Sequence, residues 1–317
     1  DWLAQHAREG QVIGFDPKLH TKKQMDTIHD KINGSGICLN SLKSNPIDAL
    51  WWDRPADPVG GVEVFPDAVA GASSLEKRQR IAAQMRDNGV DSVVVTLSDS
   101  ICWLLNVRGS DIDYNPLVLS YGVLHADAGF DWYVDELKLS DAVRNAMLTS
   151  GVCIHLLENF SNDIKKLSGV VQYDDQRSSI WVYDVLQAAE VNYIAGKDPC
   201  ILPKACKTPS EQLAIKQAHI RDGVALVRFM YWLDAQDLRD GHVTELLVEE
   251  KLEDYRRADR TYRGPSFSTI AGWAEHGAII HYRATPDSNA VLCGSGFLLL
   301  DSGGQYEYGT TDITRTI

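Results

Sequence analysis

Two aspartates near the end of the sequence, Asp301 and Asp312, have the residue type and spacing that could support metal-dependent chemistry. Asp301 follows the continuous apolar run at 297–300, which is typical of a strand that is covered on both faces. A carboxylate at the end of such a strand must be paired, hydrogen-bonded or bound to a metal ion. We therefore expect Asp301 to have a partner within the fold.

The segment that joins the two aspartates predicts an antiparallel hairpin. Gly303, Gly304 and Gly309 supply turn flexibility, so the carboxylates are expected to lie opposite or diagonal to one another. Directly opposed side chains have Cβ atoms about 5 Å apart, and like charges there are destabilising unless a cation lies between them. Carboxylate oxygens suit Mn²⁺ or Mg²⁺, and two such groups can bridge metals about 3.5–4 Å apart that activate a shared hydroxide.

A simpler alternative needs no metal. Asp301 would cap a turn, and Asp312 would pair with Arg315. An aspartate, a glycine-rich turn and a second aspartate form a common pattern that is only weakly specific for metals. From spacing alone, this alternative is somewhat favoured over the metal site.

His281 is the histidine best placed to assist such chemistry. It lies in the β-branched segment 277–282, "GAIIHY", which predicts a strand. A lone histidine on an apolar strand is more often a core residue than a catalytic one. Its functional alternative is to donate a hydrogen bond to a developing oxyanion beside the metals.

Two other charged segments have simpler interpretations. Arg108 and Asp111 lie on a glycine-containing loop, where an internal ion pair or a turn hydrogen bond is expected. His219 lies beside Arg221 and Asp222 in a predicted long helix, and we expect a solvated helix face there.

Length and composition limit the class of protein. The 317 residues exceed what one core usually holds, and 44% hydrophobic with 24% charged residues is ordinary for a globular protein. The net charge of −13 argues against binding to nucleic acid or to an anionic membrane. No apolar run approaches the length of about 20 residues that spans a bilayer. The six scattered cysteines contain no CxxC pair and favour a reducing, cytoplasmic compartment.

The predicted elements divide the chain into three domains. Residues 1–67 contain a strand, a turn at Asp16-Pro17 and a helix, followed by a Pro- and Gly-rich crossing at 48–67. Residues 68–197 alternate between helix and strand in the manner of a layered α/β domain, and "SSIWVYD" at 178–184 is predicted as one of its strands.

The third domain, 198–317, begins with a helix. Thr208 is the predicted N-cap, Pro209 the first helical residue and Glu211 the capping-box partner of a helix that runs to about Leu238. A second helix starts after Thr244. The predicted strands that follow are at 267–272, 277–282, 296–303 and 309–316.

These motifs together resemble a known family. The strings are "DALWWDRPADPV" (48–59), "WLLNVRGSDIDYNPLVLSY" (103–121), "KACKTPSEQ" (204–212), "AHIRDGVALVRFMYWL" (218–233), "SFSTIAG" (266–272), "GAIIHY" (277–282) and "DSGGQYEYGTTDITRT" (301–316). Along nearly its whole length, the chain resembles the aminopeptidase P (Xaa-Pro aminopeptidase) group of creatinase-like, pita-bread metallopeptidases. The resemblance implies an α/β and α+β multidomain fold, with two creatinase-like α/β domains before the first half of a pita-bread domain.

The resemblance also implies a site and a reaction. Asp301 and Asp312 would be ligands of a dinuclear site, usually of manganese, which displaces the simpler alternative. A metal-bridging hydroxide would attack peptides with proline in the second position and release their first residue. His281 would lie beside the scissile carbonyl. Arg108 is hypothesised to bind substrate in a neighbouring subunit of a homodimer, and the enzyme is expected to be cytoplasmic, without nucleic-acid or membrane partners.

The chain departs from the family pattern in two respects. The family's remaining ligands, a histidine and two glutamates, lie downstream of the TTDITRT segment, and no residue follows Ile317 here. We therefore expect an N- and C-terminally incomplete copy that is inactive by itself. Trp273, Glu275 and His276 also replace a stretch that in the family usually holds small residues and asparagine. The alternatives are a non-catalytic pita-bread module that binds peptides or proteins, or a prolidase- or creatinase-type hydrolase.

Overall fold

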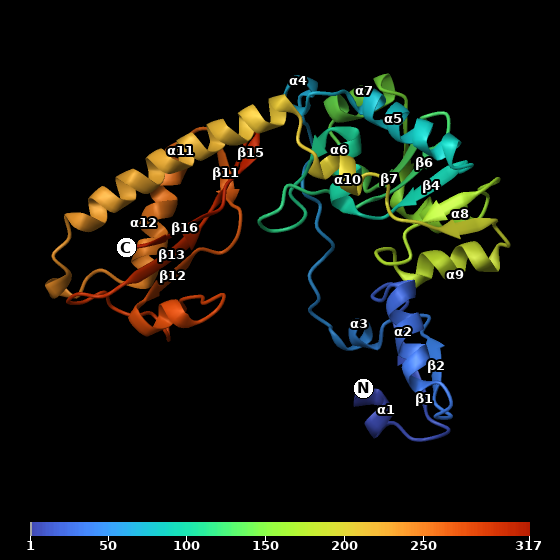
Figure 1. Ribbon diagram of the computed structural model, residues 1–317, viewed down its shortest axis with the longest axis horizontal. Helices are drawn as coiled ribbons and strands as arrows, with labels where there is room; N and C mark the ends of the chain where they lie inside the picture. Colours follow the sequence, from blue (N-terminus) through green and yellow to red (C-terminus); the bar gives the residue numbers. More distant parts are fainter. Residues whose placement is uncertain (1) are drawn as a thin grey trace. The chain divides into compact units, whose positions relative to one another are not determined.

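The computed structural model describes residues 2–317, which divide into two compact units (Figure 1). The first unit comprises Asp1–Asp67, Ala72–Asp111 and Leu117–Cys206. The second unit comprises Ala68–Gly71, Ile112–Pro116 and Lys207–Ile317. The three-domain division with boundaries at 67 and 197 stays a prediction.

The first unit begins with the predicted strand, turn and helix. Helix α2 is capped by Thr21, whose hydroxyl accepts from the Gln24 amide while the Gln24 side chain accepts from the Thr21 amide. Strands β1 and β2 pair in parallel. The elements of this region are α1 (Trp2–His6), β1 (Val12–Phe15), α2 (Lys22–Ile32), β2 (Cys38–Ser41) and α3 (Pro46–Leu50).

A six-stranded mixed sheet forms the centre of the first unit, in the order β10-β9-β4-β6-β7-β8. Strand β6 is antiparallel to both its neighbours, and the other pairs are parallel. A separate antiparallel pair joins β3 (Glu63–Val64) to β5 (Val107–Arg108). The strands of the large sheet are β4 (Ser92–Val95), β6 (Tyr121–His125), β7 (Phe130–Val134), β8 (Val152–Leu156), β9 (Val171–Tyr173) and β10 (Tyr193–Ala195).

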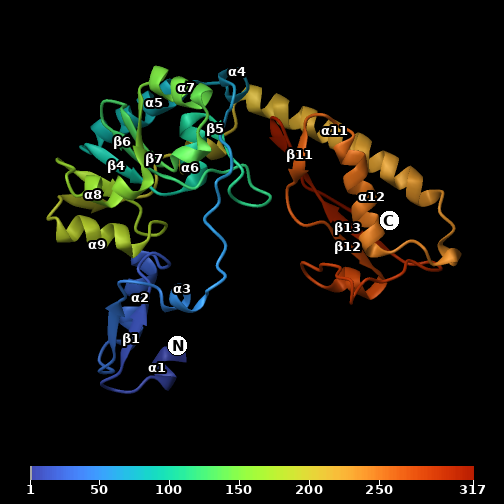
Figure 2. The same ribbon diagram turned by 180° about the vertical axis from the view of Figure 1, so that it is seen from behind.

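Helices cover both faces of this sheet and give three layers (Figures 1 and 2). The sheet separates two hydrophobic cores. Side chains alternate along β4, so Val93 and Val95 belong to one core and Val94 to the other. The first core packs against α5 (Ser74–Asp87), α6 (Ser98–Leu105) and α7 (Asp141–Thr149), and the second against α8 (Phe160–Ile164) and α9 (Ile180–Ala188). The remaining short helices are α4 (Asp67–Ala70), α10 (Ile201–Ala205) and the 3₁₀ turns Glu136–Lys138 and Leu157–Asn159.

The strand predicted at 178–184 is wrong, because these residues begin helix α9. Their β-branched and aromatic composition suggested a strand. Val182 and Leu186, four residues apart, are fully buried in the core on that side of the sheet. Helical spacing of buried positions therefore outweighed local propensity.

Two helices start the main part of the second unit. Helix α11 (Pro209–Asp234) has the predicted capping box between Thr208 and Glu211, and it ends four residues before the expected Leu238. A 3₁₀ turn, Leu238–Asp240, leads to α12 (Glu245–Arg257), where Thr244 is the N-cap as predicted.

Two small antiparallel sheets complete the second unit. One has the order β12-β13-β16 and the other β11-β14-β15. Helices α11 and α12 pack on the first sheet, where Leu298 and Leu300 of β13 join Phe229 and Leu252 in one core. The strands are β11 (Tyr262–Pro265), β12 (Ile270–Trp273), β13 (Leu298–Ser302), β14 (Gly304–Tyr306), β15 (Gly309–Thr310) and β16 (Ile313–Thr316).

The strand predicted at 277–282 is also wrong. The chain forms a 3₁₀ helix, Ala274–Ala278, and then a turn in which Ile280 is 87% exposed and His281 has a φ of 56°. The carboxylate of Glu245 accepts hydrogen bonds from side chains on both sides of this turn, His276 and Tyr282. These contacts, rather than a strand ladder, fix the segment.

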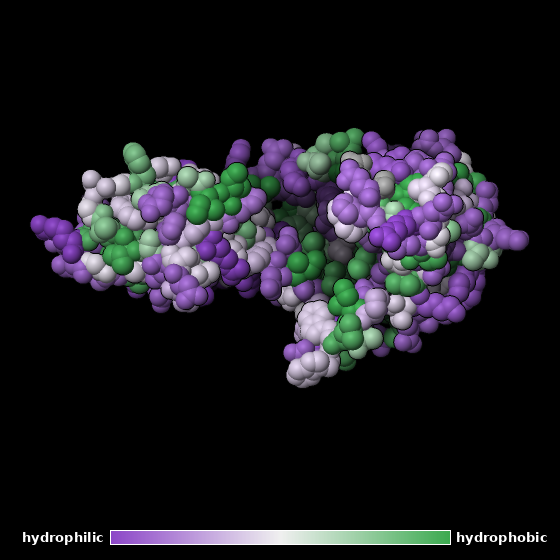
Figure 3. Space-filling model, turned by 90° about the horizontal axis from the view of Figure 1, so that it is seen from below, coloured by the Kyte–Doolittle hydropathy of each residue, from purple (hydrophilic) through white to green (hydrophobic). Residues whose placement is uncertain are grey.

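The surface is mixed in character. In Figure 3, hydrophilic residues are interspersed with separate hydrophobic patches over the visible face. Among residues 2–317, no helix combines the length and hydropathy needed to cross a membrane. All six cysteines are unpaired, and burial raises the pKa of Cys102 to about 11.

Candidate metal and peptide site

The predicted hairpin brings the two aspartates to one face of the sheet. Strands β13 and β16 pair antiparallel with Asp301 opposite Thr314, and Asp312 lies two residues before Thr314. Asp312 immediately precedes β16, and extending this register and the alternation of side chains by one residue would place it diagonal to Asp301. The burial pattern of β13 shows that this is the face opposite α11 and α12, since Leu298, Leu300 and Ser302 are the buried positions.

Both carboxylates keep most of their acceptor capacity. Asp301 is half-buried and accepts a hydrogen bond of 2.6 Å from the Thr314 hydroxyl. Asp312 is exposed and forms no ion pair with the other described residues. The Arg315 guanidinium donates to the Thr314 carbonyl instead, at 2.7 Å. The simpler alternative, an Asp312–Arg315 pair, is therefore absent from the part of the chain that the structure describes.

The donor chemistry at this face suits part of a site for hard divalent cations, which prefer carboxylate oxygens. Within residues 2–317, however, no group of three or more His, Cys, Asp or Glu side chains lies close enough to hold a metal ion. Asp301 and Asp312 would therefore bind a cation firmly only together with further ligands.

The other two candidates belong to different elements of the fold. His281 is exposed in the turn after the 3₁₀ helix. Arg108 is in β5 of the first unit, with its guanidinium 4.3 Å from the centre of the Phe65 ring. The expected loop ion pair involves a different cation, because Asp111 pairs with Lys138 at 2.7 Å.

Sequence reasoning missed a charged centre behind the aspartates. His219 is exposed as expected, but the solvated face predicted for Asp222 is wrong, since its side chain is 0% exposed. Arg256 donates to both Asp222 oxygens, from Nε at 2.6 Å and from Nη2 at 3.2 Å. Tyr306 and Thr311 each add a hydroxyl donor at 2.9 Å.

A sequence signal for Asp222 does exist. Ala218, Asp222, Leu226 and Phe229 recur at helical spacing and are all buried on one face of α11. A charged residue in the middle of such a stripe must have a buried partner. Burial, together with the nearby Asp222 carboxylate, raises the pKa of Tyr306 far above its ordinary value, so this phenol stays a donor.

Glu245, at the start of α12, is a second buried centre. Its carboxylate accepts from the backbone amides of Trp273 and Ala290 and from the side chains of His276 and Tyr282. Burial raises the pKa of Glu245, but these hydrogen bonds outweigh it and hold the pKa below its usual range. Two residues that depart from the family pattern, Trp273 and His276, thus bind Glu245.

Glu249 lies one helical turn after Glu245 and has the opposite behaviour. Burial raises its pKa to about 7, Arg283 opposes the rise and Glu245 adds to it. Its Oε1 atom is buried without a hydrogen-bond partner among the described residues. Glu249 lines a cavity of 360 Å³ together with Tyr114 and Arg283.

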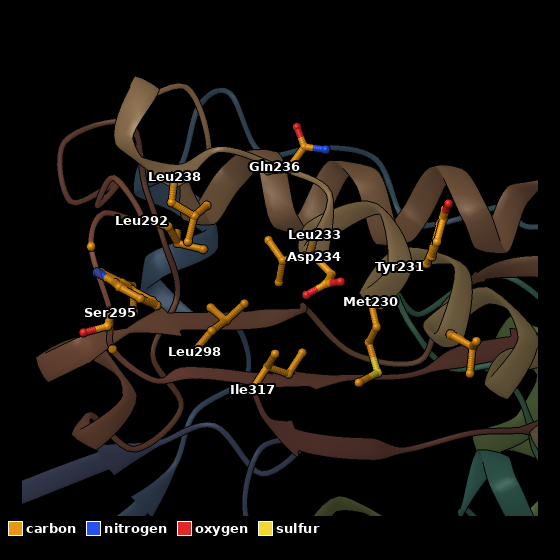
Figure 4. A pocket seen from close by; sticks show the side chains of 14 residues that line it. Met230, Tyr231, Leu233, Asp234, Gln236, Leu238, Leu292, Ser295, Leu298 and Ile317 are labelled. Carbon is orange, nitrogen blue, oxygen red and sulfur yellow. The ribbon is translucent and has the colours of Figure 1, made fainter.

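An apolar pocket of 660 Å³ lies between the end of α11 and the strands β13 and β16. Figure 4 shows Met230, Leu233, Leu298 and Ile317 pointing into a common space, while Gln236 points away from it. None of the four predicted site residues lines this pocket.

Two family models match the chain. Residues 53–211 match the Creatinase/Prolidase N-terminal domain, and residues 214–317 match Metallopeptidase family M24. The second match contains β13, β16 and both aspartates. The fold and the site thus define a creatinase-like protein with an M24 metallopeptidase segment.

Individual relatives narrow the class. Xaa-Pro aminopeptidase 1 of Dictyostelium discoideum is 34% identical over 332 residues, which cover 100% of this chain and 52% of the relative. The crystal structure of X-prolyl aminopeptidase from Caenorhabditis elegans, described as a cytosolic enzyme with a di-nuclear active site, is 29% identical with a TM-score of 0.92, covering 100% of this chain and 52% of that one. A Xaa-Pro dipeptidase from Bacillus anthracis shares the fold, at 20% identity and a TM-score of 0.60, over 77% of this chain and 65% of its own.

The chain belongs to the creatinase-like metallopeptidase family, and its whole length is similar to Xaa-Pro aminopeptidases of the aminopeptidase P group. It spans about half the length of the curated relatives that it matches. The mixed α/β fold and the family resemblance expected from the sequence are thereby confirmed.

Removing Asp222 is expected to destabilise the protein strongly. Asp222→Ala leaves Arg256 as a buried charge without its partner, which costs about 3–5 kcal/mol in the free energy of unfolding. Arg221→Ala, one residue away, removes only a solvent-accessible ion pair with Asp259 and should cost less than about 1 kcal/mol. Chemical denaturation measures both, and equal small losses would contradict the account.

Glu249 is expected to make stability depend on pH. Its pKa is raised from 4.5 to about 7, so its contribution is complete below pH 4.5 and is lost as the pH rises through 7. Glu249→Gln should remove this loss, and the stability difference between variant and wild type should therefore grow between these pH values. Parallel stability curves for the two proteins from pH 4.5 to 8 would show that Glu249 titrates normally.

Proposed function

We propose that this protein is a metal-dependent exopeptidase, an Xaa-Pro aminopeptidase that releases the first residue from peptides with proline in the second position. The observation that supports the proposal is the register of β13 and β16, which, extended by one residue, would bring Asp312 to the same face as Asp301, opposite the helices. Similarity to Xaa-Pro aminopeptidases along the whole chain supports the substrate class.

In this proposal, Asp301 and Asp312 bind two divalent metal ions, with Mn²⁺ as the working choice. Metal ions held by these carboxylates and the further ligands would supply the activated water needed to hydrolyse the peptide bond. Two carboxylates alone do not hold two metals, so the other ligands are proposed to belong to the half of the relatives' length that this chain does not span. Residues 1–317 by themselves are accordingly proposed to be inactive.

His281 is the proposed catalytic residue, and Arg108 is the proposed substrate-binding residue. The nitrogen of an Xaa-Pro bond carries no hydrogen, so recognition of that bond must involve its carbonyl oxygen. We assign to exposed His281 the hydrogen bond to the oxyanion that develops on this oxygen. Arg108 is proposed to bind peptide in the partner of a homodimer, a role that rests on the family resemblance.

The proposed setting is the cytoplasm, as described for the enzyme of Caenorhabditis elegans. Neither nucleic acid nor a membrane is a proposed partner, since the net charge of −13 would repel both. Peptides with a free N-terminus are the proposed substrates.

A peptide-binding module without catalysis is the second candidate. The absence of a metal-ligand group of three or more among residues 2–317 favours it. The presence of both aspartates on one sheet face favours the enzyme, because a module has no use for two like charges on neighbouring strands.

Replacing the aspartates tests the enzyme. In the longer protein that carries the proposed remaining ligands, Asp301→Asn and Asp312→Asn should each lower the Mn²⁺-dependent cleavage of an Arg-Pro-Pro peptide at least about 100-fold, because each removes a charged ligand. Asp287→Asn, at an exposed loop position, is the matched control and should cleave normally. Peptide binding without cleavage by that longer protein, with no residue replaced, would favour the module.

Arg108 has its own test. In the same longer protein, Arg108→Ala should raise the KM for this peptide with little change in kcat, because the side chain is assigned to binding. Unchanged kinetics would remove Arg108 from the site.

A further inference from the structure

The buried pair of Asp222 and Arg256 contacts the residue next to each aspartate in the chain. Ser302 follows Asp301 in β13, and Thr311 precedes Asp312. Both neighbours are 0% exposed. The Ser302 hydroxyl accepts from Arg256 Nη2 at 3.0 Å, and the Thr311 hydroxyl donates to Asp222 at 2.9 Å.

The hydroxyl, amide and carbonyl groups of Thr311 all form hydrogen bonds. Its hydroxyl also accepts from the Gly304 amide at 2.9 Å, and its own amide donates to the Gly304 carbonyl at 2.9 Å. Its carbonyl accepts from the Ser266 hydroxyl at 2.8 Å. A Cβ atom at Gly303 would lie 2.0 Å from that carbonyl oxygen, so the chain passes too closely there for any other residue. The backbone immediately before Asp312 is therefore held in a fixed position.

Ser302 has the same effect on Asp301. Consecutive residues in a strand point to opposite faces, so the Ser302 side chain points towards the helices and that of Asp301 points away. Anchoring Ser302 to Arg256 thus fixes the twist of β13 where Asp301 projects. The pair of Asp222 with Arg256 is neutral, and it adds no net negative charge behind the two carboxylates.

We propose that Asp222 and Arg256 are positioning residues for the metal site, acting through Thr311 and Ser302 to set the separation of Asp301 and Asp312. This inference rests on the proposed function, since it takes the two aspartates as metal ligands. Partners that orient a ligand typically contribute a factor of about 10–100 to metal affinity. A purely structural role for the same contacts changes stability and leaves metal affinity unaltered.

The test separates these two roles by measuring Mn²⁺ affinity and, without metal, the unfolding midpoint of the purified longer protein that carries the proposed remaining ligands. Thr311→Val removes the hydroxyl but keeps the shape, and it should weaken Mn²⁺ binding about 10–100-fold. Thr311→Ser restores the hydroxyl and should bind within about threefold of wild type. Thr310→Val is the matched control, because that exposed hydroxyl donates to the Gln305 side chain and its loss should leave affinity unchanged.

Ser302→Ala provides an independent variant if Thr311→Val does not fold, and it should also weaken Mn²⁺ binding. Wild-type affinity in both variants, with a lower unfolding midpoint, would overturn the inference and leave a structural role only. Asp301→Asn and Asp312→Asn distinguish a failure of the proposed function from a failure of the positioning role alone. If these retain wild-type affinity, or if the longer protein with no residue replaced binds no Mn²⁺, the proposed function fails and this inference fails with it.

Discussion

The buried ion pair between Asp222 and Arg256 is the interaction on which the second unit depends. It joins α11 to α12, and the hydroxyls of Ser302, Tyr306 and Thr311 join it to both small sheets. An unpaired charge at this depth would cost several kcal/mol, so the helices and strands must assemble together. The helices in turn bury Leu298 and Leu300, which leaves the opposite face of β13 to carry Asp301.

This arrangement explains how two like charges are tolerated on one sheet face. Each carboxylate is anchored through a buried neighbour, while its own oxygens remain largely without protein donors. Asp301 accepts from Thr314, and Asp312 is exposed. Repulsion between carboxylates on neighbouring strands is relieved when a cation lies between them. The close placement of the two carboxylates destabilises this sheet face when no cation is bound. The same placement would allow a divalent metal ion to bind between them.

Part of the fold and of the candidate site could be predicted from the sequence. Capping residues such as Thr208 and Thr244 marked helix starts correctly, because their side chains make local hydrogen bonds. Glycine spacing and the apolar run before Asp301 were enough to predict the hairpin. Segment 178–184 was misassigned because burial at helical spacing outweighed its β-branched composition.

The remaining errors share one cause, which is contact between residues far apart in the chain. Asp222 looked like part of a solvated helix face, and its partner Arg256 lies 34 residues away. The segment at 277–282 looked like a strand, but Glu245, 31 residues before His276, holds it in another shape. Neither partner can be read from local pattern, although a charge within a buried helical stripe was a signal available for Asp222.

The measurement that tests the central claim most directly is a crystal structure, grown with Mn²⁺, of the longer protein that carries the proposed remaining ligands, with data collected for anomalous scattering from manganese. The account predicts an anomalous peak about 2–2.6 Å from carboxylate oxygens of both Asp301 and Asp312. No manganese at this face, with Asp312 paired instead to Arg315, would contradict it.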